Sequence, residues 1–91
     1  MSLNSFTEEV RDFLRKVNSG NENNHQKIEW LREEFTQLQC AIERSDMPKV
    51  QHQLYDMMYL IFEIAAANDL DLDSEWKIGA ERKAEKYLKA D

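Results

Sequence analysis

Oxygen-bearing side chains recur at a spacing of three in two segments of this sequence. Glu34 and Gln37 are three residues apart, and so are Gln53 and Asp56. On a helix, this spacing places both members of a pair on one face. Glu33 precedes the first pair, and Asp56 directly precedes an apolar run, where an unpaired carboxylate is costly. Two helices that each offer such a pair can build an oxygen-rich site for Mg²⁺ or Mn²⁺.

The same residues also suit a protein without such a site. Glu33 and Glu34 fit a solvated helix face, as most acidic pairs on helices do, and Asp56 fits hydrogen bonds from Tyr or Lys side chains. Spacing alone therefore leaves both interpretations open.

The composition restricts the class of protein. Ninety-one residues with a net charge of −6 fit a single domain, residues 1–91, without the basic surface that a nucleic-acid polymer requires. The longest apolar run, Met57 to Phe62, is far shorter than the ~20 residues of a membrane span. A lone cysteine, Cys40, cannot form an internal disulfide, so we expect a cytoplasmic protein with a reduced thiol.

Two glycines and one proline leave few places for turns, which favours a few long helices. Helical periodicity predicts four of them, at residues 5–17, 24–44, from 48 onward and from about 71 or 73 to 88. Ser5 and Glu8 have capping-box spacing at the first start. Asn23 and Asp46 are the expected N-caps of the second and third helices.

The apolar residues of these helices indicate how they pack. The second helix carries a seam of residues spaced three and four apart, and the last helix carries a similar inner stripe. The stripe comprises Leu72, Trp76, Ala80, Ala84 and Tyr87. The third helix is apolar almost all round, and four short helices cannot surround one of their number. We therefore predict an all-α, antiparallel four-helix bundle that is completed by a homodimer or higher homo-oligomer.

Four segments follow one another in an informative order and spacing. They are Leu31–Ile42, Gln53–Met58, Asp69–Leu72 and Arg82–Tyr87. They resemble, in turn, four motifs of the MazG-like all-α nucleoside triphosphate pyrophosphatases: E-E-x-x-E-L with a following Ala-Ile pair, E-L-x-D-V-L, G-I-D-L and K-N-x-x-K-Y. The resemblance covers roughly residues 28–88 and has no gap from Gln53 to Tyr87.

This resemblance implies hydrolysis of a nucleoside triphosphate to the monophosphate and pyrophosphate, with Mg²⁺ or Mn²⁺ as the cofactor. It assigns the metal ligands to the two spaced pairs and the activation of water to Glu33. The metal ligands would be Glu34, Gln37, Gln53 and Asp56. Phosphate binding falls to Lys83, with Arg82 or Lys86, and base binding to the aromatic residues Phe13, Trp30 and Tyr59.

The departures from the family pattern matter for activity. Gln37 and Gln53 stand where the family has Glu, so two ligands keep an oxygen but lose their charge, which weakens Mg²⁺ binding. Lys83 replaces an Asn, and Gly79 stands at a Lys position. The alternative is therefore a catalytically weak or inactive homologue that binds a nucleotide or a partner. A helical dimerisation module without a site is the third hypothesis.

Overall fold

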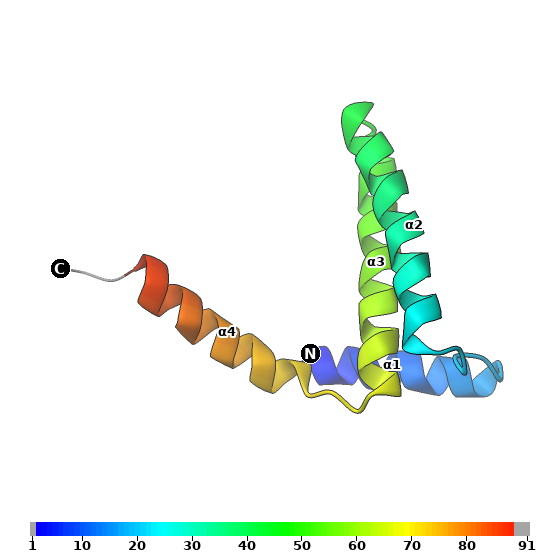
Figure 1. Ribbon diagram of the computed structural model, residues 1–91, viewed down its shortest axis with the longest axis horizontal. Helices are drawn as coiled ribbons and strands as arrows, with labels where there is room; N and C mark the ends of the chain where they lie inside the picture. The colour runs from blue at the N-terminus through cyan, green and yellow to red at the C-terminus, as the bar shows by residue number, and fades with distance from the viewer. Residues whose placement is uncertain (1, 89–91) are drawn as a thin grey trace.

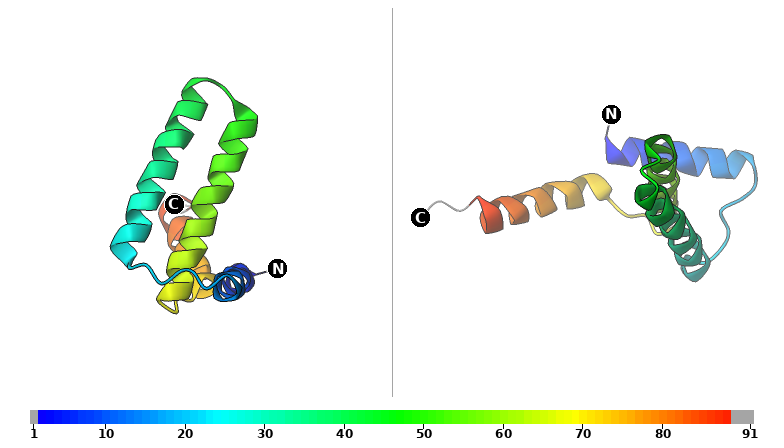
Figure 2. Two further views of the ribbon diagram at one scale, coloured as in Figure 1. Left: turned by 90° about the vertical axis from the view of Figure 1, so that its right-hand side faces the viewer. Right: turned by 90° about the horizontal axis from the view of Figure 1, so that it is seen from above.

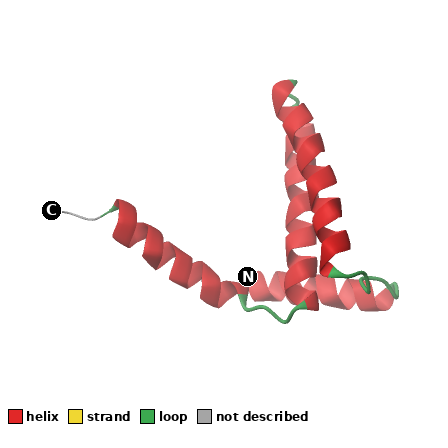
Figure 3. Cartoon of the chain, in the orientation of Figure 1, coloured by secondary structure: helices red, strands yellow, loops and turns green. Residues whose placement is uncertain are grey.

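The computed structural model describes residues 2–88, which form four helices. These are α1 (Leu3–Lys16), α2 (Asn24–Glu43), α3 (Met47–Ala67) and α4 (Leu72–Tyr87). No strand occurs within the described residues, so the all-α prediction is confirmed (Figure 3). None of these helices has both the length and the apolar character needed to cross a membrane.

Short polar side chains set the helix starts. The side chains of Asn23 and Asp46 accept hydrogen bonds from the backbone N–H three residues on, at 2.9 and 3.3 Å, as predicted N-caps should. The predicted start of α1 is wrong, because Ser2 is its N-cap and the helix begins at Leu3. The Ser5 amide donates to the Ser2 hydroxyl at 3.1 Å, so the same capping chemistry occurs three residues earlier.

The hairpin of α2 and α3 forms the centre of the molecule. These two helices run antiparallel and side by side, and α1 crosses the lower end of α3 (Figure 1; Figure 2). The rings of Phe6 on α1 and Phe62 on α3 stack with centroids 5.7 Å apart. The buried apolar core is small and lies along these contacts. It consists of Val10, Ala41, Leu60 and Ala65.

Helix α4 leaves the rest of the chain as an arm (Figure 1). It touches α1 near its own start, and none of its residues is buried. Trp76 and Tyr87, which belong to the predicted inner stripe, are 71% and 70% exposed. The four helices therefore do not close into a bundle within one chain. Periodicity identifies which face of a helix is apolar, but it does not show which chain covers that face.

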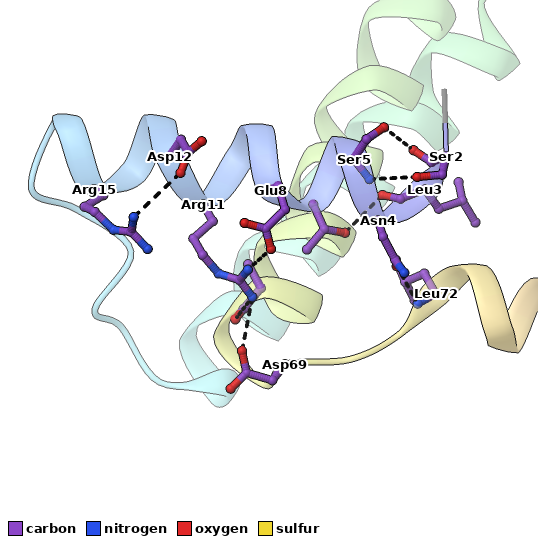
Figure 4. Close-up of polar contacts among 12 residues, drawn as sticks. Ser2, Leu3, Asn4, Ser5, Glu8, Arg11, Asp12, Arg15, Asp69 and Leu72 are labelled. Atoms are coloured by element: carbon purple, nitrogen blue, oxygen red, sulfur yellow. Dashed lines mark hydrogen bonds and ion pairs between the residues drawn. The ribbon is translucent and has the colours of Figure 1, made fainter.

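A reciprocal capping joint fixes the start of the arm. The backbone amides of Leu3 and Asn4 donate to the two carboxylate oxygens of Asp73 at 2.8 and 3.2 Å. In return, the Asn4 side-chain oxygen accepts from the Leu72 amide at 3.0 Å (Figure 4). Each helix thus satisfies free N–H groups at the start of the other.

Two further contacts strengthen this joint. The Asn4 amide donates to Asp71, and this bond, followed by that from the Ser74 amide, lowers the pKa of Asp71. Arg11 reaches across from α1 to the Ala66 carbonyl at 3.0 Å and to Asp69 at 3.1 Å, as Figure 4 shows for Asp69. The segment between α3 and α4 is therefore tied to α1 at both of its ends.

The joint yields a stability prediction. We expect Asp73→Ala to lower the free energy of unfolding by about 1–2 kcal/mol, because two α1 amides lose their acceptor. Glu75→Ala is the matched control, since Glu75 is also an acid in the first turn of α4, but among residues 2–88 its side chain pairs only with Arg82, at 3.7 Å. Urea unfolding of both variants tests this, and equal losses would show that the capping bonds contribute nothing.

Candidate functional site

The two spaced pairs of the sequence meet across the α2–α3 hairpin. Gln53 on α3 is 3% exposed, and its amide donates to the side-chain oxygen of Gln37 on α2 at 3.2 Å. One turn along, Glu34 and Asp56 approach closely enough for the charge of Asp56 to raise the pKa of Glu34. Because the two helices are antiparallel, the first residue of the α2 pair, Glu34, lies opposite the last residue of the α3 pair, Asp56. Gln37 correspondingly lies opposite Gln53. We call these four residues the hairpin site.

The electrostatics of the hairpin site favour a positive charge. Burial raises the pKa of Glu34 most, and the negative charges of Asp56 and then Glu33 raise it further, whereas His52 lowers it. The imidazole Nε2 of His52 lies 3.1 Å from Asp56. A carboxyl group under this influence gains from a proton or from a nearby cation.

Two oxygens of the hairpin site lack partners. Glu34 Oε2 and Gln53 Oε1 are buried and accept no hydrogen bond from any described residue. Buried oxygen atoms without donors are costly, and they are the ligand type that a hard divalent cation prefers. The residues present therefore fit Mg²⁺ or Mn²⁺ in the chemistry of their donors.

The donor set is nevertheless weak in charge. Within residues 2–88, no group of three or more His, Cys, Asp or Glu side chains is arranged to hold a metal ion. The hairpin site has two carboxylates, and its other two members are amides that bond to each other. Amide oxygens can bind Mg²⁺ but bring no negative charge.

Glu33 occupies a different position from its neighbour. It is exposed, and Glu34 is partly buried. Consecutive helix residues point about 100° apart, so Glu33 lies beside the hairpin site rather than within it. This position is open to water, which the predicted role in activating a water molecule requires.

An apolar groove of about 670 Å³ runs between α1 and α3. We call it the α1–α3 groove. Aromatic rings from both helices line it together with Asp56, which also belongs to the hairpin site. The aromatic residues are Phe6, Phe13, Tyr55, Tyr59 and Phe62.

The groove unites part of the predicted base-binding set. Phe13 and Tyr59 line it, whereas Trp30 on α2 does not. The hydroxyl of Tyr59 is buried without a described partner, and burial followed by the neighbouring Tyr55 raises the pKa of Tyr59. Tyr55 is a groove residue that sequence reasoning missed. Its position four residues before Tyr59, on the same helix face, was the available signal.

The predicted phosphate-binding residues lie on the arm. Arg82, Lys83 and Lys86 are exposed on α4, which extends away from the hairpin (Figure 1). Arg82 lies 3.7 Å from Glu75, and the Lys86 ammonium lies 5.1 Å from the ring centre of Tyr87. Within one chain, the structure therefore brings the metal-ligand candidates together but leaves the basic residues apart from them.

Compared with protein-family models, with curated proteins and with solved structures, the chain shows no match in any of the three.

Proposed function

We propose that the chain is a nucleoside triphosphate pyrophosphohydrolase whose hairpin site holds Mg²⁺ or Mn²⁺. The observation that carries this proposal is the meeting of Glu34 with Asp56 and of Gln37 with Gln53 across one hairpin. A packing module gains nothing from two unpartnered buried oxygens at that place. The adjoining groove offers an aromatic surface for a base, and it shares Asp56 with the site.

Each residue has a distinct role in this proposal. A divalent cation, when bound, supplies positive charge to the triphosphate and polarises its phosphorus. Glu33, exposed beside the site, orients the attacking water and accepts its proton as the bond to the pyrophosphate leaving group breaks. The rings of Phe13 and Tyr59 stack against the base. Lys83, with Arg82 or Lys86, stabilises phosphate charge.

A second copy of the chain belongs to this proposal. A compact monomer of this mass exposes about 5,500 Å², whereas this chain of 10.8 kDa exposes 7220 Å². Its radius of gyration is 15.8 Å, against about 12 Å for a compact domain of this length. Such an extended chain with so small a core gains stability by self-association, so we propose a homodimer.

One observation supports the alternative of a site that binds but does not turn over. The Gln53 amide donates to Gln37, so this amide pair satisfies itself in part without a cation. A site of this kind could hold a nucleotide through the groove and contribute little to hydrolysis. The alternative predicts nucleotide binding without release of pyrophosphate.

Pyrophosphate release from a panel of ribo-, deoxy- and modified nucleoside triphosphates tests the proposal, first with Mg²⁺ and then with Mn²⁺. We expect Glu34→Ala to lose at least about 100-fold in turnover, because it removes one of two charged ligands. Glu43→Ala is the matched control, since Glu43 is an exposed acid on the same helix. Turnover that survives Glu34→Ala would refute the assignment. Nucleotide binding without turnover with either metal would favour the alternative.

A further inference from the structure

One face of the arm is apolar and uncovered. Trp76 and Tyr87 are eleven residues apart, which is about three helical turns, so they share a face. Both side chains are more than two-thirds exposed. This face, which we call the arm face, also includes Lys83 between them. Its members are Leu72, Trp76, Ala80, Lys83 and Tyr87.

The α1–α3 groove has the complementary character. It is apolar and aromatic, and Phe13, Tyr55 and Met58 in its lining are about half exposed. An apolar groove between two helices suits an amphipathic third helix. The lining contains two acidic side chains, Glu9 and Asp56, and the arm face contains one basic side chain, Lys83. The two surfaces therefore carry charges of opposite sign, which attract each other.

The joint keeps the arm out of its own groove. The bonds from Leu3 and Asn4 to Asp73 hold the start of α4 against the first turn of α1. From that point α4 extends away from α3 in the view of Figure 1 and in the view from above (Figure 1; right panel of Figure 2). The groove and the arm face of one chain thus remain apart, although each suits the other.

The surface area fits an exchange between two copies. The chain exposes 7220 Å² of surface, which is about 1,700 Å² more than a compact monomer of the same mass would expose. Burying that excess on two chains removes about 3,400 Å² in total, which lies within the range of permanent homodimer interfaces. A contact limited to one small patch would leave most of this excess exposed.

We propose that two copies exchange their α4 arms, so that the arm face of each lies in the α1–α3 groove of the other. The contact is symmetric, with Lys83 of one copy meeting Glu9 or Asp56 of its partner. This inference rests on the self-association proposed above. Because the arm face and a nucleotide base would meet the same groove lining, Phe13 and Tyr59 can stack against a base only where the partner's arm leaves them uncovered. The exchange also means that the basic residues of the arm reach Asp56 only between two chains.

Sedimentation equilibrium of two matched variants tests the exchange. We expect Trp76→Asp to raise the dissociation constant of the dimer by about 100-fold or more, because a charge enters a buried apolar contact. Ile78→Asp places the same charge on the same helix, about 160° away from Trp76, and should leave the dimer unchanged. Ile78 is 49% exposed, so neither substitution disturbs a buried residue of the chain. Circular dichroism checks that both variants keep their helices.

Tryptophan emission provides a direct second reading. In a Trp30→Phe background, Trp76 is the only fluorophore of its kind, and its emission should shift to the blue as the protein concentration rises. A monomer at every concentration would overturn both the exchange and the proposed self-association. A dimer that tolerates Trp76→Asp would overturn the exchange alone. A monomer with blue-shifted emission would show that the arm folds onto its own groove, which also overturns the exchange.

Discussion

Replacing Lys27 by Met is expected to lower the free energy of unfolding by about 3 kcal/mol. Lys27 is 1% exposed, which is unusual for lysine, and its ammonium donates to the Gly20 carbonyl at 3.3 Å. Burial raises the pKa of the Glu63 carboxyl above 4.5, and the negative charge of Glu22 raises it further. The positive charge of Lys27 lowers this pKa and so opposes the effect of burial. Without the ammonium, a buried carboxylate remains with no compensating positive charge.

Urea unfolding near neutral pH measures this loss. Lys49→Met, at an exposed lysine on α3, is the control and should change stability by less than about 0.5 kcal/mol. The double variant Lys27→Met with Glu63→Leu should recover most of the loss, because it removes the stranded charge as well. No recovery would show that Lys27 acts by packing and not by charge.

The pH dependence of the Lys27 variant has a definite sign. The folded-state pKa of Glu63 is raised, so its protonated form is favoured in the folded protein. The stability associated with that form is fully present below the ordinary pKa of 4.5 and is lost as the pH rises through the raised value. The deficit of Lys27→Met should therefore be largest at neutral pH and shrink toward pH 4.5. A deficit that does not change with pH would contradict the electrostatic explanation.

Converting both glutamines of the hairpin site to glutamate should strengthen Mg²⁺ binding by about 10-fold or more. In Gln37→Glu with Gln53→Glu, two carboxylates join Glu34 and Asp56 at the same position. Without metal the four negative charges repel one another, so the melting temperature should fall. Saturating Mg²⁺ should reverse this fall, because a ligand that binds only the folded state stabilises it. If the site hydrolyses nucleotides, turnover should rise as well.

The control for this experiment keeps the net charge constant. Gln39→Glu with Gln51→Glu adds the same two charges at exposed positions on α2 and α3. Titration calorimetry with Mg²⁺, together with thermal melts with and without Mg²⁺, compares the two double variants. An equal response of both would mean that the added charge acts through the general field of the protein, and that the four residues form no metal site.

Local chemistry explains what the sequence could predict of the fold. Asn23 and Asp46 act on backbone amides three residues away, so their capping is encoded within one turn. The meeting of Glu34 with Asp56 followed from equal spacing on two helices joined by a short turn. These features depend on few residues, and no distant contact competes with them.

Features that depend on distant contacts were not predictable. Lysine is normally a surface residue, so the sequence gives no sign that Lys27 is buried. Its burial follows only from how the segment before α2 lies against α3. The capping of α1 by Asp73 joins residues at opposite ends of the chain. The exposure of Trp76 was missed because an apolar stripe predicts burial without specifying the covering surface.

The reciprocal capping joint also has a consequence for folding, because it connects the two ends of the chain. The hydrogen bonds of the joint connect residues that are 69 or 70 positions apart in the sequence. By contrast, only a short loop separates α2 from α3. Closing the longer loop costs more chain entropy, so we expect the hairpin to form first and the joint to form late. Until then α4 is tethered to α3 alone, and its direction is unset. The direction of the arm is therefore expected to be set late in folding, after the hairpin has formed.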